Sequence, residues 1–309
     1  MENTHKLTLS QVVEGYLLAA NGRRLSQRTI ADYSNTFRLL MDYLGDIPFT
    51  EITREQVNYF LANHPVSKKT IFNYHIGLSA LWTWALSEDL TDEHIIKKIP
   101  RAKPEQPDII PYSKDDVTKM LNSLTKSQSY QRPGKKKSFH TLKLVERHRA
   151  IILLLLDTGI RADELCTLKI HQVDFQNQQI NVWGKGAKQR IIPISAPTGK
   201  AIWKYLTKKP DASMGDPLIT TSTGRSLNRH SLLSLLKNIG DRAGVADVRV
   251  HRFRHTFAIN YLRNGGDVYT LQRILGHTTL DMVKRYLAIA QADVQKAHRK
   301  ASPVSNWDL

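Results

Sequence analysis

The chain is poor in cysteine, in long apolar runs and in acidic residues. Its 309 residues include a single cysteine, Cys166, which excludes an internal disulfide framework and a cysteine-based zinc site. The longest apolar stretch, residues 150–156, is too short to span a membrane and fits a buried helix. Because the N-terminus also lacks the apolar core of a secretion signal, we expect a cytoplasmic or nuclear protein without a membrane partner.

The shortage of acidic residues is confined to one part of the chain. Lys and Arg number 45 against 28 Asp and Glu, which gives a net charge of +17. Residues 1–105 hold twelve residues of each sign, so residues 106–309 carry the whole excess. A strongly basic half indicates a polyanionic partner, and nucleic acid is the first candidate because phosphate neutralisation dominates such binding. The alternative is a surface made basic for solubility.

A proline-rich stretch coincides with this change in charge. Prolines at positions 100, 104, 107 and 111 cannot lie inside a helix and favour an extended linker. We therefore expect two domains, residues 1–98 and 112–309, joined by a linker over 99–111. With 41% hydrophobic residues, a chain of this length can form a core in each.

The first domain is predicted to be helical throughout. Apolar residues recur at steps of three and four, which predicts helices near 8–21, 27–44, 53–63 and 67–87. Two of them begin alike, as Ser26-Gln-Arg-Thr-Ile-Ala-Asp-Tyr33 and Ser67-Lys-Lys-Thr-Ile-Phe-Asn-Tyr74. Each has a serine N-cap followed by cations, which oppose the helix dipole and suit an external anion such as phosphate. Alternatively, Arg28, Lys68 and Lys69 simply extend into water.

The second domain is predicted to combine helices with a small sheet, so the fold class is mainly α. A capping box at Ser113–Asp116 opens a helix to about Leu124, and a buried helix over 146–157 ends at Gly159. Residues 126–142 between them are polar and basic, and form a loop that either contacts DNA or is only solvated. The remaining helices are expected near 197–207, 228–243, 251–264, 267–275, 279–288 and 290–300.

One β-hairpin is expected in this domain. The runs Gln179–Trp183 and Gln189–Ile194 are rich in strand-forming residues and flank a turn that contains Gly184 and Gly186. Residues 218–221 are a candidate short extra strand. Lys185 at the turn is able to donate a proton or neutralise a phosphate, with Lys188 and Arg190 as competitors for that role.

Three further clusters suit phosphate chemistry. Arg161 lies in the first turn of a helix, where a cation needs an anionic neighbour, and Glu164 alone could supply it. His251 and Arg254, three residues apart, share a helix face and suit a phosphate group. Leu275-Gly-His277 is followed nine residues later by Tyr286, whose phenolate is able to attack phosphorus. Each cluster alone is weak.

Taken in order, these residues resemble the tyrosine recombinases, the integrase family that includes the Xer and Cre recombinases. The series is an Arg with a Glu three residues later, a hairpin Lys, His-x-x-Arg, Leu-Gly-His, and a Tyr nine residues beyond that His. The resemblance implies a helical core-binding domain over 1–98 and a mixed α/β catalytic domain over 112–309. Because the chain begins directly with the first core-binding helix, it looks like a simple Xer-type protein without an arm-binding domain.

The resemblance also implies a role for each matching residue. Tyr286 is the nucleophile, Arg161 and Arg254 stabilise charge on the phosphate, and Lys185 is the general acid. His251 assists proton transfer, His277 hydrogen-bonds the phosphate, and Glu164 supports Arg161. The expected reaction cuts and rejoins duplex DNA through a 3′-phosphotyrosyl intermediate and a Holliday junction, without a metal, nucleotide or other cofactor. Residues expected to contact DNA are Arg28, Lys68, Lys69, Lys188, Arg190 and Arg252.

By the same resemblance, four protomers assemble on two double-stranded DNA sites, as a homotetramer or with a paralogue. The protein would then be cytoplasmic and associated with the nucleoid. The segment from Ala290 to about Lys300 docks on a neighbouring protomer or packs on its own domain. Two features depart from the family, namely the long basic insertion at 126–142 and Asp281–Lys284 in place of a Thr-rich run. The alternatives are a type IB topoisomerase that relaxes DNA, and a non-catalytic DNA-binding protein of the same fold.

Overall fold

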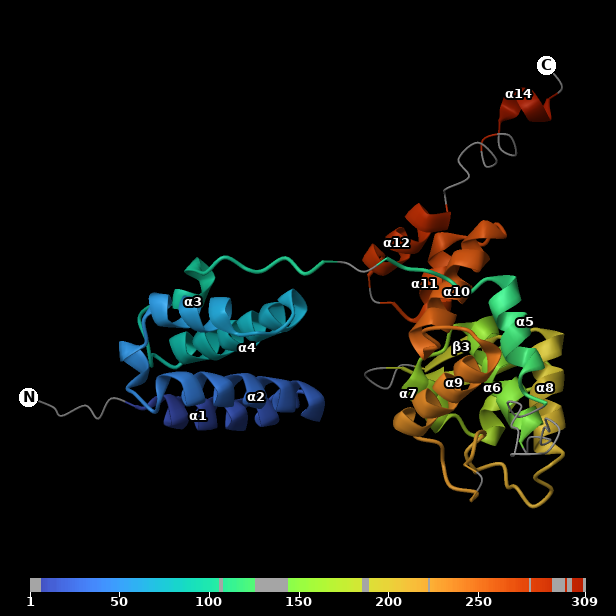
Figure 1. Cartoon of the computed structure of the whole chain (residues 1–309), viewed down its shortest axis with the longest axis horizontal. Coiled ribbons are helices and arrows are strands. Elements are labelled where there is room, and N and C mark those ends of the chain that lie inside the picture. Colours follow the sequence, from blue (N-terminus) through green and yellow to red (C-terminus); the bar gives the residue numbers. More distant parts are fainter. Residues whose placement is uncertain are drawn as a thin grey trace, which may run out of the picture. The chain divides into compact units, whose positions relative to one another are not determined.

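The chain forms two compact units, residues 1–107 and 108–309, which we describe separately (Figure 1). This is a computed structural model, and it describes residues 7–105, 108–125, 144–184, 189–221, 223–277, 279–290, 298 and 302–307. The predictions for Lys185, Lys188, the 126–142 loop and nearly all of the 290–300 helix lie outside these residues.

The first unit is a bundle of four helices with two short 3₁₀ turns. Its elements are α1 (Leu9–Gly22), α2 (Gln27–Leu44), η1 (Phe49–Glu51), α3 (Arg54–Asn63), α4 (Lys68–Ser87) and η2 (Ile95–Lys98). The predicted serine caps are confirmed, because Ser26 Oγ accepts from the backbone N–H of Thr29 and Ser67 Oγ from that of Thr70. The core includes Tyr16, Phe37 and Trp82, each at most 2% exposed.

The second unit carries the remaining elements. They are α5 (Lys114–Asn122), α6 (Val145–Thr158), α7 (Ala162–Thr167), η3 (Ile170–Gln172), β1 (Val173–Asp174), β2 (Gln179–Trp183), β3 (Gln189–Pro193), α8 (Ala196–Leu206), α9 (Arg229–Ala243), α10 (Val250–Arg263), α11 (Val268–Leu275), α12 (Asp281–Ala290) and α14 (Pro303–Asn306). The predicted capping box of α5 is confirmed by reciprocal hydrogen bonds between Ser113 and Asp116.

The sheet has three antiparallel strands in the order β1-β2-β3. The predicted hairpin pairs Gln179 with Pro193 and Trp183 with Gln189. The prediction of a strand over 218–221 is wrong, since this segment contributes only an isolated bridge between Thr220 and Ser226. The two-residue strand β1 was not predicted because so short an edge carries no alternation to detect.

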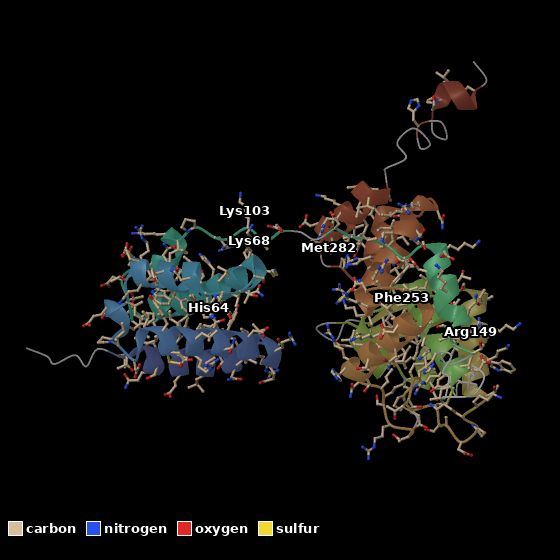
Figure 2. The ribbon with its side chains drawn as sticks, viewed as in Figure 1. His64, Lys68, Lys103, Arg149, Phe253 and Met282 are labelled. Atoms are coloured by element: carbon tan, nitrogen blue, oxygen red, sulfur yellow. The ribbon has the colours of Figure 1, made fainter. Side chains whose placement is uncertain are left out.

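Two apolar clusters hold the second unit together around α10. The larger joins α5, α6, α8 and α9 to the sheet and reaches Phe253 of α10, which is labelled in Figure 2. The smaller includes Ala258 and Ile259 of α10, Leu271 and Leu275 of α11, and Tyr286 of α12. Helix α10 therefore connects the two clusters and carries the His-x-x-Arg motif between them. No helix in the described ranges is long and apolar enough to cross a membrane.

Candidate active site

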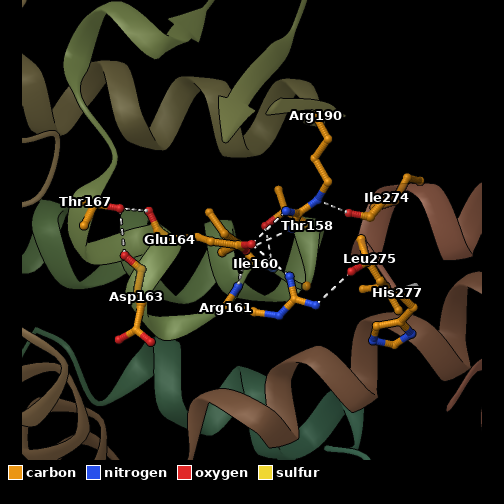
Figure 3. A network of polar contacts seen from close by, with 12 residues as sticks. Thr158, Ile160, Arg161, Asp163, Glu164, Thr167, Arg190, Ile274, Leu275 and His277 are labelled. Atoms are coloured by element: carbon orange, nitrogen blue, oxygen red, sulfur yellow. Dashed lines mark hydrogen bonds and ion pairs between the residues drawn. The ribbon is translucent and has the colours of Figure 1, made fainter. Parts of the chain in front are cut away.

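Arg161 and Arg190 form a network of charges with the buried carboxylate of Glu164 (Figure 3). Glu164 is 6% exposed, and its carboxylate accepts from Arg161 Nη1 at 2.9 Å and from the backbone N–H of Arg161 at 2.9 Å. Arg190 donates to both oxygens of the same carboxylate, at 2.7 and 2.9 Å. Burial acts to raise the pKa of Glu164, but the hydrogen bonds from Arg190 and Arg161 outweigh it and hold the pKa below its ordinary value. The carboxylate is thus a fixed anion.

Arg254 is fixed by main-chain carbonyl groups. It is only 5% exposed, and it donates through Nη1 to the carbonyl of Gly159 at 2.8 Å and through Nη2 to that of Leu275 at 2.7 Å. Burial and the nearby charge of Arg161 lower its pKa to about 10. The guanidinium therefore stays protonated near neutrality, and the ends of α6 and α11 both hold it in place.

His277 completes this arrangement in the turn between α11 and α12. Its Nε2 lies 2.7 Å from Arg254 Nη2, and since a guanidinium only donates, Nε2 accepts. The hydrogen of the neutral ring is then on Nδ1, which is buried and has no partner within the described residues. Burial and the charges of Arg254 and Arg161 lower the pKa of His277 to about 4, which keeps the ring neutral. The site therefore holds an unsatisfied N–H donor.

Tyr286 lies in the smaller apolar cluster with its hydroxyl turned toward histidine. The side chain is 1% exposed, and its oxygen is 2.9 Å from Nδ1 of His255. Burial raises the phenol pKa, which Arg254 and Arg285 partly offset. The Tyr286 ring also lies 6.4 Å from that of His277, nearly parallel to it. The phenol is thus buried but adjacent to Arg254 and His277.

His251 begins the same helix as Arg254 and is exposed. Partial desolvation of the ring and the nearby cations Arg229 and Arg254 lower its pKa, so it is neutral at physiological pH. The imidazole of His255 also lies near cations. Burial, His251 and Arg254 together lower the pKa of His255 to about 4. Both rings are therefore neutral near pH 7, and each has one nitrogen that is able to accept a hydrogen bond.

A cavity of about 870 Å³ opens beside these residues. Its lining includes Arg161, Arg190, Arg273, Gly276 and His277. Three guanidiniums around one cavity suit an anionic group with several oxygens. No group of three or more His, Cys, Asp or Glu within the described residues is placed to hold a metal ion.

The residues expected to contact DNA occupy different environments. In the first unit, Arg28 is exposed and lies 3.9 Å from Asp32, and Lys68 binds Glu105 at 2.7 Å (Figure 2). The Lys69 ammonium lies over the ring of Phe72. In the second unit, Arg190 is held by Glu164 and the Ile274 carbonyl. Arg252 donates to the carbonyls of Ile110 and Ala246 and lies 4.2 Å from the Tyr112 ring centroid.

Sequence reasoning missed two features of this site. The sequence predicts no role for His255, which directly follows Arg254 on α10 and contacts Tyr286 of α12. Arg190 is predicted to contact DNA, and the sequence does not indicate that its guanidinium is also a second partner of Glu164. The position of strand β3 beside α7 brings Arg190 next to Glu164, which is 26 residues away in the sequence. A contact between such distant residues leaves no local sequence pattern.

Comparison with known proteins places this arrangement in a family. Residues 136–293, about half of the chain, match the phage integrase family. Tyrosine recombinase XerC of Staphylococcus aureus strain RF122 is 36% identical over 160 residues. That alignment covers 51% of this chain and 54% of the relative, so the chain matches about half the length of that curated protein.

Two solved structures share the fold across both units. The Tn1549 transposon integrase in complex with transposon right-end DNA has a TM-score of 0.73 at 19% identity, covering 94% of this chain and 99% of that one. The XerH recombinase bound to palindromic difH substrate has a TM-score of 0.70 at 20% identity, covering 97% and 85%. At these identities the likeness concerns the fold alone. The shared fold is mainly helical with a small sheet, as the sequence predicts. With the family match over half of its length, the chain belongs to the phage integrase family, the tyrosine recombinases.

Proposed function

We propose that this protein is a site-specific DNA recombinase that cuts and rejoins duplex DNA through a phosphotyrosine intermediate. The observation that carries the proposal is the convergence of Arg254, His277 and Tyr286, with Arg161 held nearby by Glu164. Family membership and the cavity lined by three guanidiniums support it.

The cleavage step follows from these groups. The Tyr286 oxygen attacks the scissile phosphorus, the bond from phosphorus to the 5′-oxygen breaks, and a 3′-phosphotyrosine and a free 5′-hydroxyl result. Arg161, Arg254 and the Nδ1–H of His277 stabilise the charge that develops on the non-bridging oxygens. Because the phosphotyrosine conserves the bond energy, a 5′-hydroxyl from another strand is able to reverse the attack.

Two proton transfers accompany this step. The phenol proton passes to the neutral imidazole of His255, whose Nδ1 already lies 2.9 Å from the phenol oxygen. His251, assigned this transfer by the family resemblance, lies on the same helix face as Arg254. The departing 5′-oxygen takes its proton from Lys185, an assignment that rests on the family pattern since this residue lies outside the described ones.

The nucleophile must move before it reacts. Tyr286 is 1% exposed and does not line the cavity that holds Arg161 and His277. The Tyr286 hydroxyl reaches a DNA phosphate at that cavity only when α12 shifts. We propose that DNA binding supplies the free energy for this shift. The described state is therefore a resting state of the enzyme.

The partner in this proposal is a double-stranded recombination site, bound by both units. The relatives of known structure include an integrase with transposon-end DNA and a recombinase with difH DNA. Residues 106–309 supply the basic surface, and Arg28, Lys68 and Lys69 of the first unit supply further backbone contacts. Assembly of four protomers on two sites completes the exchange.

Covalent capture tests this function without knowledge of the DNA site. The full chain is incubated with a library of duplexes that carry randomised arms and a nick, so that cleavage traps the protein. The covalent complex is isolated on a denaturing gel and its DNA is sequenced. We expect one enriched sequence family from the wild type, and none from Tyr286→Phe, which keeps the ring but lacks the nucleophile.

Two further measurements complete the test. Tyr286→Phe retains binding to the enriched duplex, since only the hydroxyl is removed. Equal capture by the wild type and Tyr286→Phe would overturn the proposal. Efficient relaxation of a supercoiled plasmid without the enriched sequence would overturn site specificity in favour of a topoisomerase.

A further inference from the structure

A second group of buried cations lies at the opposite end of α6 from the active site. Arg147, in the first turn of α6, is 7% exposed. Its Nη1 donates to the carbonyl of Thr220 at 2.8 Å, and its Nη2 lies 2.9 Å from Nε2 of His148. Arg242, at the end of α9, is close enough to lower the pKa of His148. The distance along α6 from Arg147 to Thr158 is roughly 16 Å, at about 1.5 Å per residue.

These side chains have more donors than acceptors. Because Arg147 only donates, Nε2 of His148 accepts and the hydrogen of this neutral ring is on Nδ1. That Nδ1, the Nε of Arg147, and the Nε and Nη2 of Arg242 are all buried without a hydrogen-bond partner in the described part of the chain. Four unsatisfied atoms are thus all donors, and a buried donor costs about 1–3 kcal/mol unless an acceptor reaches it.

No carboxylate of the described residues compensates this charge. Burial lowers the pKa of Arg147, with only Tyr205 acting in the other direction, and burial alone lowers the pKa of Arg242. The sequence before α6, residues 126–143, contains no Asp or Glu. A buried cation without an anion is disfavoured, so Arg147, the member of this group that lines a cavity, favours an anionic ligand.

A cavity of about 490 Å³ adjoins Arg147. It is lined by the first turn of α6, by Tyr205 of α8, by Lys208 and Lys209 just after that helix, and by Thr220, Thr221 and Gly224. Glu146 is the acidic residue among them, against the three cations Arg147, Lys208 and Lys209. The N-cap of α6 is Leu144, which offers no side-chain acceptor to the first-turn N–H groups. The volume falls within the range of about 300–1,000 Å³ typical of small-molecule sites.

We propose that this cavity binds the dianionic phosphate group of a small molecule, held by Arg147, Lys208, Lys209 and the N-terminus of α6. A free phosphate compound fits better than a phosphate of the DNA backbone. Arg147 is 7% exposed, so a group that reaches it must enter the cavity, which a rigid duplex cannot do. The site is separate from the active site, since Arg161 and His277 line a different cavity.

Binding of inorganic phosphate tests this site in the full chain. Isothermal titration at constant ionic strength compares the wild type with Lys208→Gln/Lys209→Gln. The matched control is Lys200→Gln/Lys204→Gln, which removes the same charge from exposed positions of α8, outside the cavity. Repeating all three in an Arg161→Gln background removes phosphate binding at the active site.

We expect saturable binding by the wild type and the control, and at least tenfold weaker binding by Lys208→Gln/Lys209→Gln, in both backgrounds. Affinity for duplex DNA is expected to fall equally in the two double variants. Equal phosphate affinity in all proteins would overturn the proposal. So would a selective loss of duplex affinity in Lys208→Gln/Lys209→Gln without a loss of phosphate binding, which would assign these lysines to the DNA backbone.

Discussion

The oxygen of Tyr286 and Nδ1 of His255 are joined by a hydrogen bond of 2.9 Å between α12 and α10. Tyr286 belongs to an apolar cluster that includes Ile259, Leu275 and Val283. His255 therefore provides the polar partner that a buried phenol requires. Because burial, His251 and Arg254 lower the pKa of His255 to about 4, its ring is neutral and able to take the phenol proton.

Replacing His255 by Phe should slow DNA cleavage by about a hundredfold, the lower range for loss of a general base. The wild-type rate should be flat between pH 6 and 8.5, because the base is already deprotonated. In His255→Phe the attack needs a phenolate, whose pKa burial raises, so the rate should increase about tenfold per pH unit. Single-turnover cleavage of a nicked duplex measures both.

His171→Phe is the control for this prediction, since His171 is exposed and lies on the short turn η3. It should leave both the rate and its pH dependence unchanged. A His255→Phe protein with the wild-type profile would show that His255 only fills space beside the phenol.

The stability of the protein should fall as the pH decreases from 6.5 toward 4. His148, His255 and His277 each have a pKa of about 4 in the folded chain, against about 6.5 for a free imidazole. Between these values the unfolded chain binds more protons, so acidification favours unfolding by up to about 1.4 kcal/mol per pH unit for each group. Urea unfolding at pH 7.5, 6 and 5 measures this slope above the range in which carboxylates titrate.

His148→Asn should give a shallower slope, because one of the three groups is removed. An unfolding midpoint that is the same at pH 7.5 and pH 5 would contradict the prediction. The result does not depend on DNA, so it tests the burial of the imidazoles separately from catalysis.

Local patterns predicted most of the helices, the hairpin and the order of the site residues. Ser26, Ser67 and Ser113 are caps whose partners lie three residues away, so the sequence alone reveals them. The contacts that fix the site join distant segments. Arg254 binds the carbonyls of Gly159 and Leu275, and His255 binds Tyr286, 31 residues away. Such pairs depend on how α6, α11 and α12 pack on α10, which periodicity does not specify.

Glu164→Gln should destabilise the fold by about 3–5 kcal/mol, the cost of removing one partner of a buried ion pair. The carboxylate has a side chain 5% exposed and neutralises both Arg161 and Arg190, which the amide leaves without a counter-ion. The neighbouring Asp163→Asn is the control. Its side chain is 71% exposed and lies 3.5 Å from Arg229, so its loss should cost less than about 1 kcal/mol. Urea unfolding compares the two, and similar losses would contradict the role of the Glu164 network.

Gly159→Ala should affect both stability and DNA cleavage, whereas Gly244→Ala should affect stability alone, and to a smaller extent. Both glycines end a helix with positive φ, +59° and +65°, where a side chain costs about 1–2 kcal/mol. At Gly244 an added Cβ meets no atom within 4 Å, but at Gly159 it lies 2.7 Å from Phe257 and 2.9 Å from Leu275. The Gly159 carbonyl also accepts from Arg254 Nη1, so a shift of this turn moves the guanidinium that stabilises the phosphate. We expect Gly159→Ala to lose more stability than Gly244→Ala and, under conditions where both are folded, to cleave a nicked duplex more slowly. Equal stability and equal cleavage rates in the two variants would show that the turn at Gly159 does not position Arg254.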